Sequence, residues 1–339
     1  MNPDSSVEAS APARVDLAGG TLDLWPLHVL HPGSVTVNLA IDRRATCRVR
    51  TSEAGVRLIA PDRQLDLRAD SARELRADPR TALVAALVEE IRPDVPVEVE
   101  FRSGVPFGSG LGGSSALAVA VAAALTHWTG ASLDGAGGVE LVRDVETRVL
   151  GKPAGVQDYY SAFGGGLHCL WFETGRTVAE RLDVDPDDWD RHLTLFDTGA
   201  AHSSGMNNWE VFRRRLEGDA GVTRSLDSIA QAAREMAAAA KRKDFPAMGR
   251  SLDAEWQSRR ELAPVVSSPA IERAIARARE AGAWGGKACG AGGGGCVVFL
   301  SPADRTGPVR EALGGLDGGQ VLPVRAEPRG LFCTASTEK

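Results

Sequence analysis

Residues 104–115 read GVPFGSGLGGSS, a stretch in which five of the twelve residues are glycine and the last two are serine. The preceding residues 95–102 (VPVEVEFR) alternate apolar and polar side chains as a β-strand does, and residues 116–127 are alanine-rich, which is typical of a helix. The sequence therefore predicts a strand, a glycine loop (residues 104–115) and the N-terminus of a helix. Backbone N–H groups and the positive end of the helix dipole favour an anion there, and we expect the triphosphate of a nucleotide.

Three other interpretations of the glycine loop were weighed. Residues 108–113 satisfy the G-x-G-x-x-G pattern of dinucleotide-binding proteins, but that pattern needs a following strand, and the next predicted element is a helix at 139–150. A Walker loop is not indicated, because Gly286-Lys287 is followed by Ala288, and the protein-kinase HRD and DFG signatures do not occur. The glycines could also simply permit a tight turn.

Composition and charge narrow the class of protein. The 339 residues are 43% hydrophobic and 25% charged, with a net charge of −6, which is ordinary for a globular protein of about two domains. The acidic balance argues against a nucleic-acid partner or a basic membrane-binding surface. The five cysteines include no CxxC pair, and no apolar leader or 18-residue apolar run is present. We therefore expect a cytoplasmic protein without structural zinc, signal peptide or membrane span.

The order of the predicted elements favours an α+β protein with two domains. Residues 1–10 are polar and are expected to be loose, and strands at 35–41 and 46–50 are joined by the polar residues 42–44. The acidic segment 183–190 is taken as the linker, which gives domains 1–188 and 189–339. The other expected elements are strands at 56–60, 167–172, 192–196, 297–300, 320–325 and 330–334, helices at 81–92 and 139–150, and four helical patterns between 209 and 280.

Three separated motifs resemble those of the GHMP kinases, a superfamily named after galactokinase, homoserine kinase, mevalonate kinase and phosphomevalonate kinase. The first is Pro12–Gly20 (PARVDLAGG), in which Ala13 replaces a usual glycine. The second is Pro106–Ala116 (PFGSGLGGSSA), which needs one extra glycine or a glycine in place of a serine, and the third is the glycine-rich turn Gly290–Cys296. The resemblance implies a ribosomal protein S5 domain 2-like N-terminal domain, a ferredoxin-like C-terminal domain and an active site in the cleft between them.

The resemblance also assigns roles to residues. It implies that Asp158 is the catalytic base, that Arg14 lies beside it, and that Ser115 and Glu146 contact Mg²⁺. From the residues alone, Asp158 could instead cap a short helix, Arg14 could be a surface charge, and Glu146 could pair with Arg143 or Arg148. The residues expected to bind the ATP phosphates are Pro106, Gly108, Gly110, Leu111, Gly112, Gly113, Ser114 and Ser115.

The acceptor side resembles sugar kinases of the fucokinase and heptose-phosphate kinase type, in the segments 16–23, 157–165 and 197–199. Residues 25–28 (WPLH) match no sugar-kinase pattern that we could assign. Arg213–Arg215 form either a solvated helix face or a site for a second phosphate, and we expect Trp209, Phe212 and Leu216 to pack in the core. The residues expected to bind the substrate are Asp16, Gly20, Asp23, Gly165, His202, Gly292 and Gly293.

These observations predict a kinase that uses ATP and Mg²⁺ to phosphorylate a hydroxyl, the anomeric one, of a sugar or sugar phosphate such as heptose 7-phosphate or fucose. A mevalonate-pathway or homoserine-type kinase is the alternative enzyme. It is disfavoured because the carboxylates of Asp16 and Asp23 suit neutral polyols better than anionic substrates. A sugar- or nucleotide-binding regulator without activity and, more distantly, a nicotinamide dehydrogenase were also considered.

Overall fold

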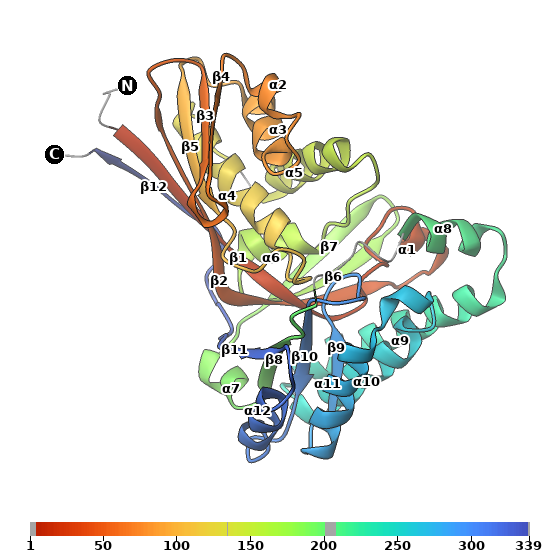
Figure 1. Ribbon diagram of the computed structural model, residues 1–339. Helices are drawn as coiled ribbons and strands as arrows, with labels where there is room; N and C mark the ends of the chain where they lie inside the picture. Colours follow the sequence, from red (N-terminus) through yellow and green to blue (C-terminus); the bar gives the residue numbers. More distant parts are fainter. Residues whose placement is uncertain (1–4, 134, 201–207, 338–339) are drawn as a thin grey trace.

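The computed structural model describes residues 5–133, 135–200 and 208–337, and its strands form two sheets (Figure 1). The larger sheet has the order β12-β1-β2-β5-β3-β4, and β6 pairs with β2 and with β7. All its pairings are antiparallel except that of β3 with β5. Its strands are β1 (Ser5–Ala18), β2 (Val35–Thr51), β3 (Val56–Ala60), β4 (Leu65–Ala69), β5 (Val97–Arg102), β6 (Leu167–Glu173), β7 (Arg176–Leu182) and β12 (Phe332–Thr337).

The two long strands correct two sequence predictions. Residues 5–10 are not loose, because they belong to β1 and pair with β2 on one side and β12 on the other. Residues 42–44 do not separate two strands, because β2 runs on through them, and the irregularity is a register shift opposite Pro12 and Ala13. The strands β4 and β7 were not predicted. β7 is mostly exposed and lacks an apolar face, whereas the alternating apolar residues of β4 (Leu65, Leu67 and Ala69) form a pattern of only five residues that was overlooked.

One face of the large sheet is covered by helices around α4 (Gly113–Trp128). Nearly all of α4 is buried, and its many alanines let it pack closely on β1 and β2. As predicted, this helix follows the glycine loop directly, and Gly112 precedes it in the left-handed conformation (φ 69°). Its neighbours are α2 (Ala72–Leu75), α3 (Ala82–Ile91), α5 (Gly135–Leu150) and α6 (Gln157–Gly164).

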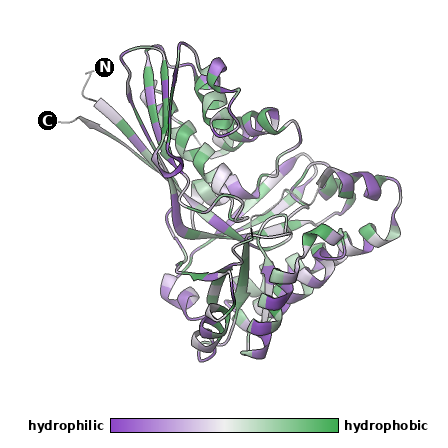
Figure 2. Cartoon of the chain, in the orientation of Figure 1, coloured by the Kyte–Doolittle hydropathy of each residue, from purple (hydrophilic) through white to green (hydrophobic). Residues whose placement is uncertain are grey.

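The second sheet, of order β11-β8-β10-β9, belongs to the C-terminal half. The helices α9 (Ala220–Lys241) and α10 (Phe245–Arg259) pack between it and the other face of β1 and β2, where apolar side chains form a shared core (Figure 2). The strands are β8 (Leu193–Asp197), β9 (Gly285–Ala288), β10 (Cys296–Leu300) and β11 (Gln320–Leu322). The remaining helices are α1 (Leu27–Leu30), α7 (Pro186–Asp190), α8 (Asn208–Leu216), α11 (Pro269–Glu280) and α12 (Thr306–Gly314), with 3-10 turns at Pro61–Arg63 and Pro264–Val266.

The helical patterns of the C-terminal half are confirmed as α8 to α11, with one correction. The side chains of Trp209 and Leu216 are 54% and 59% exposed, so they are not part of the core, and Val211 is the buried residue of α8. The division of the chain into domains at residue 188 stays a prediction. The structure shows that β12, near the C-terminal end of the described residues, pairs with β1 of the large sheet.

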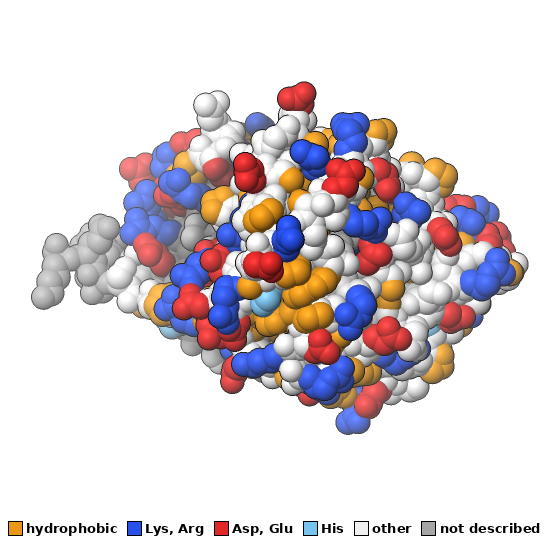
Figure 3. Space-filling view, turned by 90° about the horizontal axis from the view of Figure 1, so that it is seen from below, with side chains coloured by type: hydrophobic (Ala, Val, Ile, Leu, Met, Phe, Trp, Pro, Cys, Tyr) orange, Lys and Arg blue, Asp and Glu red, His pale blue; other side chains and the backbone are white. Residues whose placement is uncertain are grey.

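Of the helices in the described ranges, none has both the length and the apolar character needed to cross a bilayer. On the face shown in Figure 3, the coloured acidic and basic side chains are interspersed around a smaller hydrophobic area.

Candidate active site

A cavity of about 230 Å³, here called the central cavity, lies where the two halves of the chain meet. The first motif contributes the end of β1 and the turn after it, and the N-terminal half adds α4, α5 and α6. The C-terminal half adds α10 and the turn after β9. The lining side chains that carry charge are Arg14, Asp16, Asp23, Glu146, Lys152, Asp158 and Arg259.

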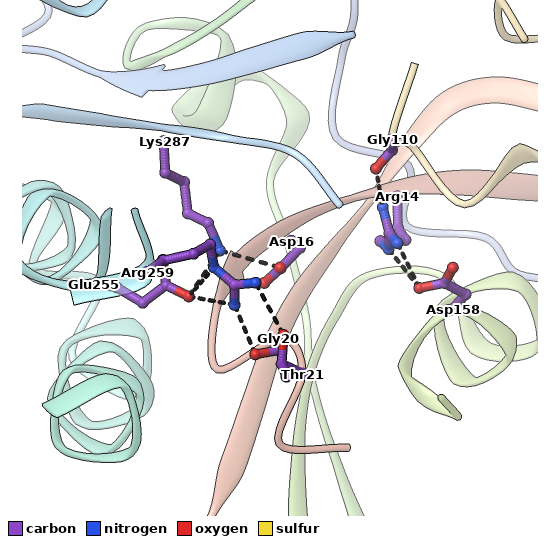
Figure 4. A network of polar contacts seen from close by, with 9 residues as sticks. All are labelled: Arg14, Asp16, Gly20, Thr21, Gly110, Asp158, Glu255, Arg259 and Lys287. Carbon is purple, nitrogen blue, oxygen red and sulfur yellow. Dashed lines mark hydrogen bonds and ion pairs between the residues drawn. The ribbon is translucent and has the colours of Figure 1, made fainter. Parts of the chain in front are cut away.

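Arg14 and Asp158 form an ion pair at this cavity (Figure 4). The guanidinium Nε and Nη2 lie 2.7 and 2.6 Å from Asp158 Oδ1, and Nη1 donates to the carbonyl of Gly110 at 2.6 Å. Arg14 is 4% exposed, so it is not a surface charge. Burial acts to lower its pKa, but Asp158 and then Asp16 outweigh this and raise it. Asp158 is the second residue of α6, whose cap position is Val156, so Asp158 is not a helix cap.

The glycines of the loop allow close approach of two other segments. A Cβ atom on Gly110 (φ 75°) would lie 2.3 Å from the carbonyl oxygen of Cys289, and one on Gly112 would lie 3.1 Å from Asp158 Oδ2. The loop is therefore packed between the turn after β9 and the Arg14–Asp158 pair. A residue with a side chain would strain the backbone at either position.

Glu146 belongs to α5, and its side chain lies at the N-terminus of α4, where it accepts three hydrogen bonds. Ser114 Oγ and Ser115 Oγ donate to it at 3.1 and 3.2 Å, and the Tyr159 hydroxyl donates at 2.5 Å. The pairing with Arg143 or Arg148 does not occur, because these arginines bind Asp144 and Glu90. Burial raises the pKa of Glu146, although its hydrogen bonds favour the carboxylate and act to lower it.

The oxygens around Glu146 are of the type that Mg²⁺ prefers. Magnesium in phosphate-binding sites takes one or two carboxylates together with hydroxyls, waters and phosphate oxygens. Glu146, Ser114 and Ser115 supply one carboxylate and two hydroxyls beside the glycine loop. The described side chains include no cluster of three His, Cys, Asp or Glu residues placed to hold a metal alone. The donor set therefore fits a cation that is shared with a phosphate ligand.

A buried network of four charges holds the turn after β1 in place (Figure 4). Lys287 Nζ lies 3.0 Å from Asp16 Oδ2 and 3.1 Å from Glu255 Oε1, and Arg259 Nη2 lies 2.6 Å from the same Glu255 oxygen. All four side chains are essentially inaccessible to solvent. Burial would raise the pKa of Asp16, but the three cations Lys287, Arg259 and Arg14 hold it below its usual range.

Arg259 also connects this network to the first motif. It donates to the carbonyl of Gly20 at 2.6 Å and to Thr21 Oγ1 at 3.2 Å, and Thr21 adopts the left-handed conformation with φ of 78°. Sequence reasoning missed Arg259, because an arginine four residues after Glu255 looks like an ordinary surface helix pair. Lys287 was considered only as the lysine of a Walker loop, which the sequence does not contain.

Asp23 is buried next to α6. Its Oδ2 accepts a hydrogen bond from the backbone N–H of Gln157 at 3.3 Å, and a Cβ atom on Gly155 would lie 2.1 Å from the same oxygen. Glycine at 155 is therefore required for this approach. Burial, with a smaller contribution from the nearby Asp158 charge, raises the pKa of Asp23 to about 6.

The structure brings three of the seven predicted acceptor residues together at the central cavity. Asp16, Gly20 and Asp23 line the central cavity. Gly165 does not, because it packs against the backbone of Arg329 and Gly330. Gly292 and Gly293 pack against the carbonyl of Val266, and Gly290 and Ala291 line the cavity in their place. His202 lies outside the described residues.

Comparison with known proteins agrees with this geometry. Residues 80–166 match the GHMP kinases N terminal domain, and residues 236–315 match the GHMP kinases C terminal domain. The chain is similar to the D-glycero-alpha-D-manno-heptose 7-phosphate kinase of Campylobacter jejuni, with 27% identity over 305 residues (87% of this chain, 89% of the relative). It is also similar to the galactokinase of Mycobacterium bovis (29% over 270 residues; 69% and 74%) and to the mevalonate kinase of Thermococcus sibiricus (28% over 348 residues; 96% and 97%).

Solved structures show the same fold along the whole chain. The crystal structure of a D-glycero-D-manno-heptose 1-phosphate kinase from Bacteroides thetaiotaomicron matches with a TM-score of 0.78 at 24% identity, and the match covers 97% of this chain and 98% of that one. The two-domain α+β architecture predicted from the sequence is thereby confirmed. With both domain families matched, and with Arg14, Asp158 and Ser115 at the end of the glycine loop lining one cavity, the chain belongs to the GHMP kinases.

Proposed function

We propose that this protein is a sugar kinase that transfers the γ-phosphoryl group of ATP to the anomeric hydroxyl of a sugar or sugar phosphate. The observation that carries the proposal is the arrangement of Asp158. Arg14 binds its Oδ1 twice, no hydrogen bond within the described residues engages Oδ2, and the carboxylate faces a cavity beside the N-terminus of α4. Oδ2 is thus available to a hydroxyl next to the expected position of the phosphates.

In this mechanism the chain's own groups orient the reactants and receive one proton. The acceptor hydroxyl donates to Asp158 Oδ2, which takes the proton as the acceptor oxygen bonds to the γ-phosphorus. The bond from that phosphorus to the bridging oxygen breaks, and ADP leaves. Arg14 keeps Asp158 ionised by its charge. The glycine loop offers N–H groups and the α4 dipole to the phosphates.

The same site would hold Mg²⁺ through Glu146 and Ser115, with Ser114 alongside. When bound, the ion supplies positive charge to the β- and γ-phosphate oxygens. Binding of a cation would also favour the ionised form of Glu146, whose pKa burial raises.

The acceptor side favours a polyol over a carboxylate substrate. Asp16 and Asp23 line the cavity, and carboxylates accept hydrogen bonds from hydroxyls but repel anionic groups. Relatives with names that include heptose 7-phosphate kinase and galactokinase support the sugar class over the mevalonate class. The arginines 213–215 do not support a second phosphate site, because they bind Glu210, Asp219 and His31 respectively.

An ATP-consumption screen tests the proposal. The purified protein would be assayed with free aldoses, sugar monophosphates, mevalonate and homoserine, and the product located by NMR. Turnover of sugars at the anomeric position is expected. Turnover of mevalonate alone would contradict the sugar assignment, and tight binding of sugar or nucleotide without any turnover would indicate a regulator.

A further inference from the structure

A second cavity, here called the side cavity, opens next to the central cavity and has no role in the mechanism above. Its volume is about 640 Å³, and it lies among α1, α5, α6 and the β6–β7 hairpin. Asp23, Pro153 and Ala154 line both cavities. Because these residues form a common border, the two cavities adjoin at Asp23.

The side cavity has aromatic walls. Trp25 lines it with a side chain that is 70% exposed, although tryptophan is costly to leave in water. The lining also includes the half-buried Tyr160 and a stacked pair, His28 on Phe172, with ring centroids 5.1 Å apart. Flat, rigid rings with polar edges bind other rings at a low cost in conformational entropy. The lining therefore fits a ring-shaped group.

The charges of the side cavity disfavour an anionic group. Its two arginines are already paired, Arg143 with Asp144 at 2.8 Å and Arg176 with Glu173 at 2.6 Å. Glu140 and Asp23 add two further carboxylates, so the acidic groups outnumber the basic ones. A phosphate placed here would meet net negative charge, whereas hydroxyl groups would find carboxylate acceptors.

We infer that the side cavity binds a second, uncharged sugar ring of the acceptor, so that the preferred substrate is a reducing disaccharide and not a free monosaccharide or sugar monophosphate. This inference rests on the proposed sugar kinase function. Asp23 lies at the junction of the two rings, the ring to be phosphorylated occupies the central cavity, and Trp25 covers the outer ring. The residues 25–28, which matched no sugar-kinase pattern, thereby acquire a role in specificity.

The test compares acceptors and variants by kcat/KM. Each monosaccharide that is turned over would be assayed beside its 6-phosphate and its reducing 1→4- and 1→6-linked disaccharides. For the wild-type protein we expect one disaccharide to exceed the monosaccharide by about tenfold or more, through a lower KM. In Trp25→Ala this ratio should fall toward one, and in Trp25→Phe, which keeps a ring, most of it should return. Phe332→Ala is the matched control, because Phe332 is an exposed aromatic residue on β12 at the edge of the large sheet.

The outcomes separate the inference from the proposed function. The side-cavity assignment would be overturned if monosaccharides and disaccharides had equal kcat/KM, or if Trp25→Ala left a disaccharide preference intact. Either result would still agree with the proposed kinase function. A preference for the sugar monophosphate over both neutral acceptors would overturn the side-cavity assignment as well. Failure of every sugar as acceptor would contradict the proposed function itself.

Discussion

Arg14 and Asp158 lie 144 positions apart in the chain, yet two guanidinium nitrogens of Arg14 converge on a single carboxylate oxygen of Asp158, at 2.7 and 2.6 Å. The pair joins β1 to α6 and also reaches the glycine loop through the carbonyl of Gly110. Because both contacts use Oδ1, the ion pair fixes the direction of Oδ2. A carboxylate that serves as a base needs this combination of a fixed orientation and one accessible oxygen.

Replacing Asp158 by Asn should therefore remove activity without removing nucleotide binding. The amide keeps the size of the side chain but does not accept the hydroxyl proton, so kcat should fall on the order of 10²–10⁴-fold. The dissociation constant of ATP, measured by calorimetry, should change by no more than about threefold. Asp66→Asn is the control, since Asp66 lies on β4, outside the central cavity, and pairs with Arg57 of the neighbouring strand β3. A near-wild-type kcat in Asp158→Asn would exclude the base role.

Replacing Glu146 by Gln should alter the dependence on Mg²⁺. The variant keeps hydrogen-bonding capacity toward Ser114, Ser115 and Tyr159 but loses the charge that would attract the cation. We expect the Mg²⁺ concentration for half-maximal rate to rise about tenfold or more, with partial recovery of rate at saturating Mg²⁺. Glu89→Gln, at an exposed pair with Arg76, is the control. An unchanged Mg²⁺ titration would remove Glu146 from the cation site.

Most of the fold was predictable because its signals are local. The glycine loop with its following helix and the helical patterns that became α8 to α11 were all expected, and all are present. The errors fall where pairing in three dimensions decides the structure. Residues 5–10 are extended because two neighbouring strands satisfy their backbone. Val7 and Ala9 alternate with polar residues and are buried, a short strand pattern that the prediction overlooked.

The site was predictable only in part, for a similar reason. Arg14, Glu146 and Asp158 lie within or near motifs, and the structure places them at one cavity. Arg259 and Lys287 come from segments with no distinctive local pattern. Their role depends on contacts with Asp16 and Glu255 in the interior, which the sequence does not reveal. Gly165 and Gly292 do not line the central cavity and pack against backbone instead, and a glycine that avoids a backbone clash looks, in sequence, like one that admits a ligand.

Loss of one charged residue from the buried network should lower the stability of the protein more than loss of one cation together with one anion. Lys287→Met leaves the carboxylates of Asp16 and Glu255 short of a buried cation, which should cost roughly 3–5 kcal/mol of stability. The double variant Lys287→Met/Glu255→Met restores charge balance and should recover much of this loss. Thermal unfolding would measure both effects, and Lys241→Met, at a surface pair with Glu180, should cost less than about 1 kcal/mol.

A change in the same network should raise the KM of the acceptor more than the KM of ATP. Arg259 holds the carbonyl of Gly20 and the hydroxyl of Thr21 at the acceptor side of the cavity. Arg259→Lys keeps the charge but not the forked geometry, so the KM of the acceptor should rise several-fold more than that of ATP. Equal changes in both KM values would indicate a general loss of structure instead of a displaced turn.

The raised pKa of Asp23, about 6, predicts two effects of pH with a common origin. Burial, together with the charge of Asp158, disfavours the ionised form in the folded state, so the unfolded chain releases this proton at lower pH than the folded chain does. The contribution of Asp23 to stability is therefore complete below about pH 4 and is lost as pH rises to about 6, by up to about 3 kcal/mol. Asp23→Asn does not titrate, so its melting temperature relative to the wild-type protein should increase from pH 4 to 6 and stay level above pH 7.

In the proposed acceptor site, ionised Asp23 offers hydrogen-bond acceptors to substrate hydroxyls, whereas the protonated group offers fewer. The KM of the acceptor should thus fall as pH rises through about 6 in the wild-type protein, and Asp23→Asn should show a higher KM without that change. The KM of ATP measured in the same series is the internal control for other titrating groups. A melting-temperature difference that stays constant from pH 4 to 7 would show that the surroundings of Asp23 do not raise its pKa. An acceptor KM that changes equally in both proteins would show that another group is responsible.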